Sequence, residues 1–337
     1  MLYLQTSLVN INMSRLVIIT ISIFTLYSCV SQKKDISKKN QDNNTGVTGN
    51  VVIQHISAQP DGLHAYNNNS AIRSFIFQYT QKTLMKLDLE TLEYTPALLD
   101  SMPKISKDGL KYTYKIKEGV TWDDGSPLTA KDVEHTVKIL LCPLTNNTQI
   151  RGNYTDVIKS IELDPTDPLV FTMHAQKLHV DNKVIFTGIY LQQKNHWDPN
   201  GILDKIKFSD LFSKDFNKNF VTEELSNYFN KFNSDDNSYT PNQLKGLGAY
   251  QVAEWETNQY IIIEKKKDWW GSSDTSIYNT AYPDKIIFRI ITDKVSVELA
   301  LKNQTIDVSN RIDTKTLIDL KKRKDFNNNY ESDFLDQ

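Results

Sequence analysis

The sequence predicts an α/β fold, because short β-rich runs alternate along the chain with segments whose apolar residues recur at helical spacing. Hydrophobic residues make up 39% of the 337 residues and charged residues 24%, a balance typical of a chain with a packed core. No internal repeat is present, and the length suits about two domains or one large one. We therefore expect a globular protein in which strands and helices interleave.

In the first half of the chain, the strand-like run Val51–Ile56 precedes a predicted helix over Ser70–Leu87, whose apolar side chains recur every three or four residues. Thr129 and Asp132 have the spacing of a capping box, so a second helix is expected to begin there. Trp122, between a strand and a tight turn, is expected to pack against that second helix. Further strands are expected at Lys111–Lys117, Val157–Leu163 and Leu169–His174, the last two as a hairpin.

The second half begins with a polar stretch, 195–240, in which only Glu223–Phe232 has a helical pattern. Three β-like runs follow it, and two helical patterns flank a short run near the end. These segments are Ala249–Trp255, Tyr260–Lys265, Lys285–Ile291, Ser296–Lys302, Thr305–Val308 and Thr314–Lys324.

The charge balance and the motifs exclude several classes of function. Lys and Arg number 39 and Asp and Glu 41, so the basic excess that a nucleic-acid groove needs is absent and no nucleic-acid partner is expected. The sequence holds no Gly-x-Ser-x-Gly, His-Glu-x-x-His or phosphate-loop motif. Asp123-Asp124 lie in a turn context, and the six histidines are scattered. We expect no enzymatic activity, no cofactor and no metal site.

The amino terminus resembles the signal of a bacterial lipoprotein. The apolar run Leu16–Tyr27 is too short to span a bilayer and has the length of a signal-peptide core, with Arg15 as its positive flank if Met13 is the true start. The run ends in Leu-Tyr-Ser before Cys29, which is similar to a lipobox, so Cys29 is expected to carry a lipid. The alternative is a signal anchor with an incidental cysteine.

Four segments in the correct order carry a family resemblance. The longest has a strand, then Gly-Val, an aromatic, Asp-Gly and Pro-Leu-Thr-Ala, followed by Lys131 and Asp-Val. The segments are 60–64 (Pro-Asp-Gly-Leu-His), Tyr112–Val133, Gly248–Trp270 and Ile286–Asp307. Together they resemble the family 5 extracellular solute-binding proteins, the receptors of peptide-type ABC importers. Ala249, Trp269, Gln304 and Thr305 depart from the family's usual Pro, Tyr, Gly and acid.

The resemblance implies a periplasmic-binding-protein-like fold of type II, cluster C, with two lobes that close on a ligand. It implies further that most of the second lobe is missing from this chain. On this basis we expect a signal peptide at 1–28, a lipid-anchored flexible tether at 29–50, a first lobe at 51–85 and 190–284, an inserted subdomain at 86–189, and the start of an incomplete second lobe at 285–337.

The function implied by the resemblance is that of a monomeric lipoprotein of the bacterial cell envelope, anchored to a membrane and facing the periplasm or the exterior. It would capture a peptide or another small solute and deliver it to an ABC permease. Two alternatives stay open at this point. The chain is a nonfunctional or structural fragment of such a receptor, or it is an envelope hydrolase with a sparse site.

The expected ligand-facing stretch is Asn67-Asn68-Asn69-Ser70, because the resemblance places this loop beside the cleft. Asparagine side chains offer both donors and acceptors to a peptide backbone. Ser70 has a second expected role as the N-cap of the following helix. The alternative is a plain helix-entry loop in which Ser70 provides the cap and nothing binds a ligand.

Overall fold

The structure, a computed structural model, describes residues 50–332 apart from 69, 89–90, 275–278 and 311. The expected signal peptide, Cys29 and the expected tether up to residue 49 therefore lie outside the described residues. Within the described part, none of the helices combines the length and the apolar character needed to cross a bilayer.

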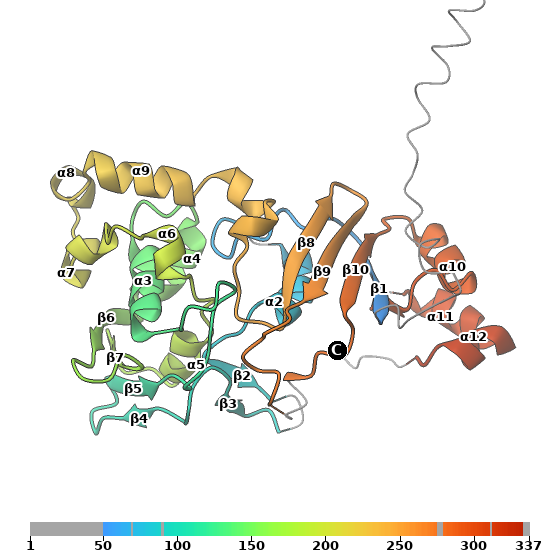
Figure 1. Cartoon of the computed structure of the whole chain (residues 1–337), viewed down its shortest axis with the longest axis horizontal. Coiled ribbons are helices and arrows are strands. Elements are labelled where there is room, and N and C mark those ends of the chain that lie inside the picture. Colours follow the sequence, from blue (N-terminus) through green and yellow to red (C-terminus); the bar gives the residue numbers. More distant parts are fainter. Residues whose placement is uncertain (1–49, 69, 89–90, 275–278, 311, 333–337) are drawn as a thin grey trace, which may run out of the picture. The chain divides into compact units, whose positions relative to one another are not determined.

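A five-stranded mixed sheet with the strand order β11-β1-β10-β9-β8 organises one part of the fold (Figure 1). β1 runs parallel to both β10 and β11, whereas β9 is antiparallel to both β10 and β8. β9 and β10 read as nearly continuous apolar runs because most of their side chains are buried. The strands are β1 (Val51–Ile56), β8 (Tyr250–Glu256), β9 (Tyr260–Lys265), β10 (Lys285–Ile290) and β11 (Val308–Ser309).

A second, antiparallel sheet has the strand order β4-β5-β7-β6. The hairpin predicted from the sequence is confirmed, since β6 pairs with β7. Helix α3 (Ala130–Leu141) has the expected capping box, in which the Asp132 carboxylate accepts the Thr129 N–H at 2.9 Å. Trp122 is buried in the same core as α3, as expected. The other elements are β4 (Lys104–Ile105), β5 (Lys111–Lys115), β6 (Ile158–Leu163), β7 (Val170–Ala175), α4 (Thr148–Thr155) and α5 (Asn182–Thr187).

The polar stretch that follows forms short helices and one longer one. Helix α9 (Glu223–Phe232) has the bounds predicted from the sequence, and its first turn is capped by the Thr222 hydroxyl, which accepts the Leu225 N–H at 3.2 Å. Leu225, Phe229 and Phe232 supply its buried face. The shorter elements are α6 (Lys194–Trp197), η3 (Leu203–Lys205), α7 (Phe208–Leu211), α8 (Phe216–Asn219), η4 (Asp235–Ser238) and η5 (Pro241–Gln243).

The last helices are α10 (Lys294–Lys302), α11 (Thr314–Lys321) and α12 (Lys324–Asn329). They share a small apolar cluster of their own, which Ile53 of β1 and Ile291 border. Because α10 connects β10 to β11, these helices are attached directly to the five-stranded sheet.

The expected domain boundaries do not coincide with the sheets. β10 and β11 follow residue 285 and yet pair with β1, so the sheet assigned to the first lobe continues into the segment assigned to a second lobe. Helices α6 and α7 follow residue 190 but pack against α3. The strands of the four-stranded sheet do all fall within 86–189, the expected subdomain. Strand pairing and helix packing therefore cross the expected breaks at 190 and 285, and the lobe boundaries stay a prediction.

The helix predicted over Ser70–Leu87 is wrong beyond residue 80. A 3-10 turn, η2 (Ala71–Arg73), leads into the short helix α2 (Ser74–Thr80). Residues Met85–Leu87 form strand β2, which pairs antiparallel with β3 (Tyr94–Pro96).

The helix ends at Thr80 because the Thr80 carbonyl group accepts a hydrogen bond from a loop that is distant in the sequence. Gly248 donates its backbone N–H to the Thr80 carbonyl at 3.0 Å, and Gln81 turns to an extended conformation. A Cβ atom at Gly248 would lie 2.2 Å from the Tyr79 carbonyl oxygen, and one at Gly246 would lie 2.1 Å from the Thr80 carbonyl oxygen. The close approach therefore requires glycine at both positions.

The loop that makes this contact, residues 245–249, is held through its carbonyl groups. The Gly246 carbonyl accepts from the Lys266 ammonium at 2.8 Å, and the Ala249 carbonyl accepts from the Lys266 N–H at 2.9 Å. The Leu247 carbonyl accepts both indole N–H groups of Trp269 and Trp270, at 3.1 and 3.0 Å. The adjacent tryptophans thus hold the loop through one carbonyl group.

A buried ion pair joins this loop to the other sheet. The Lys266 ammonium lies 2.5 Å from the Asp123 carboxylate, and the two side chains are only 11% and 8% exposed. Burial lowers the pKa of Lys266, and the charge of Asp123 opposes that shift. Asp123 belongs to the turn that follows β5, whereas Lys266 follows β9, so the pair connects the two sheets.

We predict that Lys266→Met destabilises the fold by about 3–5 kcal/mol, because it leaves the Asp123 carboxylate buried without a cation. Urea unfolding measures the change. Lys265→Met is the matched control, since it breaks the half-exposed pair with Asp284 and should cost no more than about 1 kcal/mol. Equal costs for the two variants would contradict the prediction.

Candidate functional site

The carboxyl ends of the parallel strands β1 and β10 border a cavity of about 460 Å³. In open α/β sheets, ligands bind outside the carboxyl ends of the strands, so this edge is the candidate site. Apolar side chains of α10 and its neighbours supply much of the lining, and polar groups from β1, α10 and α11 supply the rest. The lining residues are His55, Ser57, Ile291, Thr292, Lys294, Val297, Glu298, Leu301, Ile312, Asp313 and Thr316.

His55 is the buried polar residue of the cavity wall. Its Nδ1 lies 2.9 Å from the Ser309 hydroxyl on β11, and its Nε2 lies 3.0 Å from the Ile291 carbonyl. The carbonyl can only accept, so Nε2 carries the proton and Nδ1 accepts from Ser309. Burial lowers the pKa of His55, which keeps the ring neutral. His55 therefore ties β1 to β11 and to the residue that follows β10.

The charged groups at the cavity are engaged in capping and pairing. The Asp313 carboxylate accepts the Thr316 N–H at 3.0 Å and so caps the start of α11. This hydrogen bond lowers the pKa of the Asp313 carboxyl. Glu298 pairs with Lys302 one turn further along α10. Lys294 is the remaining cation of the lining, and its charge further lowers the pKa of the Asp313 carboxyl. The cavity therefore offers a small molecule both apolar surface and hydrogen-bonding groups.

The same edge continues into the loop that follows β1. The Gln59 side-chain carbonyl accepts the Asn258 N–H at 2.6 Å and the Trp255 indole N–H at 3.4 Å, so the loop crosses the β8–β9 hairpin. The Tyr239 hydroxyl then donates to the Asp61 carbonyl at 2.6 Å. The segment after β1 is thus fixed over the sheet edge before it reaches residues 67–70.

The predicted site residues of this loop are turned mainly toward the protein. Asn67 donates to the Phe232 carbonyl at 3.2 Å. Asn68 accepts the His64 N–H at 3.1 Å and donates to the Asp61 carbonyl at 3.0 Å, so both ends of its amide hold the loop together. Ser70 stands at the N-cap position of η2, but its side chain makes no capping hydrogen bond, contrary to expectation. Asn69 and Cys29 lie outside the described residues.

Sequence reasoning missed the residue that organises this loop, Arg73. Its guanidinium donates to the carbonyl groups of His64, Ala65 and Asn68, the first two at 2.9 and 3.2 Å, and it lies 4.9 Å from the centre of the Phe77 ring. An arginine among polar positions of a helical pattern gives no local signal for such a role. The cavity residues were missed for the same reason, because they come together only in the sheet.

Two buried histidines are held neutral near this part of the fold. Burial lowers the pKa of His64 to about 3, with a further contribution from the Arg73 charge. Burial also lowers the pKa of His135 to about 3, with a further contribution from Lys194. The His135 ring lies 3.3 Å from the Tyr228 hydroxyl. No group of three or more His, Cys, Asp and Glu side chains that could hold a metal ion occurs in the described part.

We predict that stability falls as the pH decreases below about 6.5. The unfolded histidines bind protons with a pKa near 6.5 and the folded ones only near 3, so their contribution is complete above pH 6.5 and is lost toward pH 3. At pH 5 each of the two histidines lowers the free energy of unfolding by about 2 kcal/mol relative to its value above pH 6.5. Unfolding of wild type and His135→Gln at pH 7.5 and pH 5 measures it.

The variant His135→Gln should lose less stability between the two pH values than the wild type does. His179→Gln, which changes a half-exposed histidine, is the control and should behave like the wild type. An equal loss in the wild type and His135→Gln would contradict the assignment of the acid sensitivity to this buried ring.

Comparison with known proteins places the fold. The family model described as "Bacterial extracellular solute-binding proteins, family 5 Middle" matches residues 93–335. Oligopeptide-binding protein AppA of Bacillus subtilis (strain 168) is 23% identical over 316 residues, which are 93% of this chain and 49% of that protein. The chain thus spans about half the length of this curated relative.

Solved structures agree with this match. The structure of AppA from Bacillus subtilis in complex with a nonapeptide has a TM-score of 0.60 and 22% identity, over 84% of this chain and 47% of that one. NikZ from Campylobacter jejuni in complex with Ni(L-His) has a TM-score of 0.60 and 22% identity, over 82% of this chain and 46% of that one. These likenesses confirm the expected α/β, periplasmic-binding-protein-like fold.

Proposed function

Because this chain belongs to the bacterial extracellular solute-binding proteins of family 5, we propose that it serves an ABC importer as a receptor for peptides or similar small solutes. The observation that carries the proposal is the coincidence of this family match with a cavity at the carboxyl edge of the five-stranded sheet. AppA, which matches 93% of this chain, is named for oligopeptide binding, and this name favours peptides over other solutes.

The chemistry of the cavity supports a binding role. The described residues around it supply hydrogen-bonding groups and apolar surface, and the acids there are used in capping and pairing. His55 is neutral, and both of its ring nitrogens are occupied by Ser309 and the Ile291 carbonyl. Such a lining can grip a solute without changing it, as a transport receptor requires.

We extend the proposal to the cell envelope. The signal-like run before Cys29 and the polar stretch after it support a lipid anchor and a tether. In this arrangement the receptor is a monomer that delivers its solute to a permease in the same membrane. Residues 67–70 are proposed to border the bound solute, with Asn68 and Arg73 keeping the loop in place.

We predict that Ser57→Phe weakens peptide binding at least about tenfold, because the added ring would fill the cavity while the fold remains intact. Calorimetry with a mixture of short peptides, preceded by mass spectrometry of solutes that copurify with the full chain, measures the binding. Ser272→Phe is the control, since Ser272 lines a separate cavity of about 470 Å³ beyond β9.

Unchanged affinity in Ser57→Phe would exclude this cavity as the binding site. Absence of any copurified or titratable peptide in the wild-type chain would contradict the receptor function itself. The two failures are therefore distinguishable.

We predict that Cys29→Ser prevents lipid attachment and leaves an unprocessed precursor, because the lipid and the cleavage both require this thiol. Metabolic labelling with palmitate, followed by membrane fractionation, measures the outcome in a bacterial host. Cys142→Ser is the matched control, since Cys142 is a buried free cysteine of the folded part and should leave labelling unchanged. Labelling of the Cys29→Ser variant would rule out this anchor.

A further inference from the structure

Three buried polar atoms behind the 61–70 loop make no hydrogen bond to another described residue. They are Nε2 of His64, Oδ1 of Asn67 and Oγ of Ser238. His64 is 3% exposed and Ser238 is fully buried. Buried polar groups in folded proteins are almost always hydrogen-bonded, so a group of three such atoms requires a partner.

The surrounding contacts define what each atom offers. The His64 Nδ1 accepts the backbone N–H groups of Tyr66 and Asn67 at 3.2 and 3.0 Å, so the ring proton is on Nε2, which is a donor. Asn67 donates through Nδ2 to the Phe232 carbonyl, which fixes its amide orientation and leaves Oδ1 as an acceptor. The Ser238 hydroxyl can donate or accept.

The three side chains belong to one small region. The His64 ring contacts the Phe232 ring with 4.7 Å between centroids, and Asn67 bonds the carbonyl of the same phenylalanine. Ser238 is joined to the residue before His64, because Leu63 donates its N–H to the Ser238 carbonyl at 2.8 Å. The loop that carries His64 and Asn67 is therefore bonded both to the end of α9 and to η4, which carries Ser238.

We propose that His64, Asn67 and Ser238 bind one ordered water molecule. A water accepts the His64 Nε2 proton, donates to Asn67 Oδ1 and exchanges a hydrogen bond with Ser238, so one molecule satisfies all three atoms. A metal ion does not fit, because Nε2 is protonated and Nδ1 is already an acceptor for two N–H groups. An anion does not fit either, because Asn67 presents an oxygen.

The bound water has a structural consequence for the candidate site. It connects the loop that carries residues 67–70 to η4, in addition to the direct Asn67–Phe232 bond. It is a positioning element and does not touch a bound solute. The inference is independent of the proposed transport function, since it concerns the folded chain alone.

The variant Ser238→Ala separates a hydrated site from a dry one. If Oγ binds a water, its removal loses a hydrogen bond and the melting temperature of the full chain should fall by about 2–4 °C. If Oγ binds no water, removal of this buried hydroxyl should leave the melting temperature unchanged or raise it. That result would overturn the proposal. Ser209→Ala, at an exposed position of α7, is the control and should change the melting temperature by less than Ser238→Ala does.

A crystal structure of the full chain at a resolution that shows ordered water provides the direct test. A density peak within about 2.7–3.2 Å of all three atoms is the expected result. A direct hydrogen bond between two of the three atoms, with no peak beside them, would overturn the proposal. Nitrogen NMR of the histidine rings adds a third arm, in which a proton on Nδ1 of His64 would likewise overturn it.

Discussion

The buried ion pair between Asp123 and Lys266 is the interaction on which the arrangement of the two sheets depends. The lysine binds the carboxylate and the Gly246 carbonyl at the same time, so the turn after β5 and the loop before β8 are held at one point. Two buried charges of this kind are costly unless both are satisfied, and here each has its partner. The loop in turn takes the Thr80 carbonyl, which ends α2 and directs the chain into β2.

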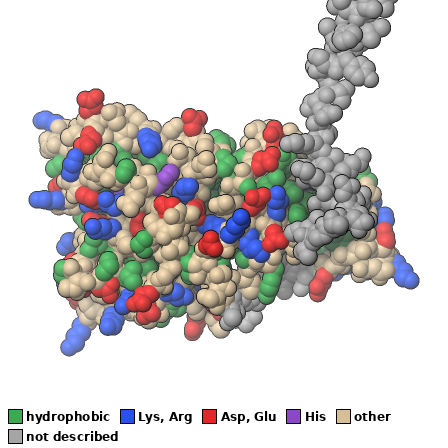
Figure 2. All heavy atoms as spheres, viewed as in Figure 1, with side chains coloured by type: hydrophobic (Ala, Val, Ile, Leu, Met, Phe, Trp, Pro, Cys, Tyr) green, Lys and Arg blue, Asp and Glu red, His purple; other side chains and the backbone are tan. Residues whose placement is uncertain are grey.

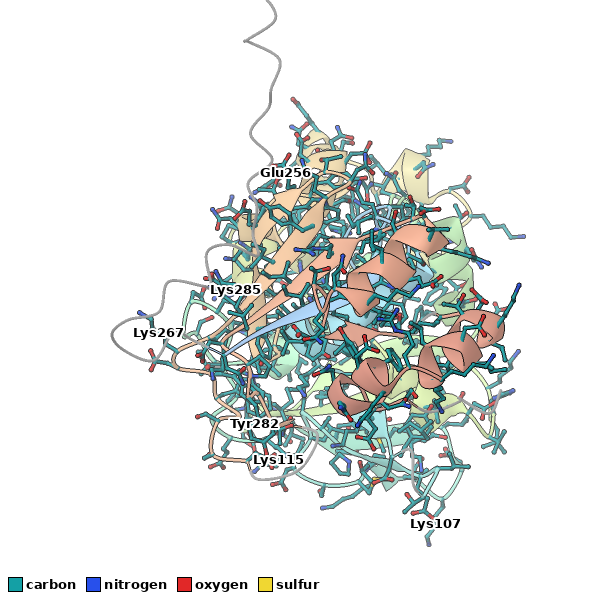
Figure 3. The ribbon with its side chains drawn as sticks, turned by 90° about the vertical axis from the view of Figure 1, so that its right-hand side faces the viewer. Lys107, Lys115, Glu256, Lys267, Tyr282 and Lys285 are labelled. Atoms are coloured by element: carbon teal, nitrogen blue, oxygen red, sulfur yellow. The ribbon has the colours of Figure 1, made fainter. Side chains whose placement is uncertain are left out.

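With the sheets held in this way, the topology of the five-stranded sheet determines where the candidate cavity lies. β1 lies between β10 and β11, and residues of α10, which connects those two strands, line the cavity beside the carboxyl ends of β1 and β10 (Figure 1). Figure 3 shows Glu256, at the end of β8, above Lys285, at the start of β10, with Lys267 and Tyr282 lower on the same side of the view. The strand ends near Glu256 and those near Lys285 are thus distinct surfaces, and the cavity belongs to the former edge.

Neutral buried histidines take part in shaping the candidate site and the 61–70 loop. His55 and His64 are both held uncharged by burial, and each uses its ring to bond backbone or hydroxyl groups of neighbouring segments. The exposed face in Figure 2 intersperses basic and acidic side chains without a large patch of one sign, in agreement with the near-zero net charge.

The sequence by itself determined the elements whose signals are local. The bounds of α9, the capping box of α3, the β6–β7 hairpin and the turn at Asp124-Gly125 follow from residues within a few positions of one another, and the spaced motifs predicted the family. Only the tertiary structure decided the end of α2, because its Thr80 carbonyl is bonded by Gly248 from a remote segment.

The tertiary structure likewise decided the membership of β10 and β11 in the sheet of β1, the roles of Arg73 and His55, and the cavity itself. Periodicity and capping report on neighbours along the chain, whereas these features arise from contacts between segments far apart in the sequence. A single sequence contains no local signal for such contacts, since the same residues would serve equally well as solvated or core side chains elsewhere.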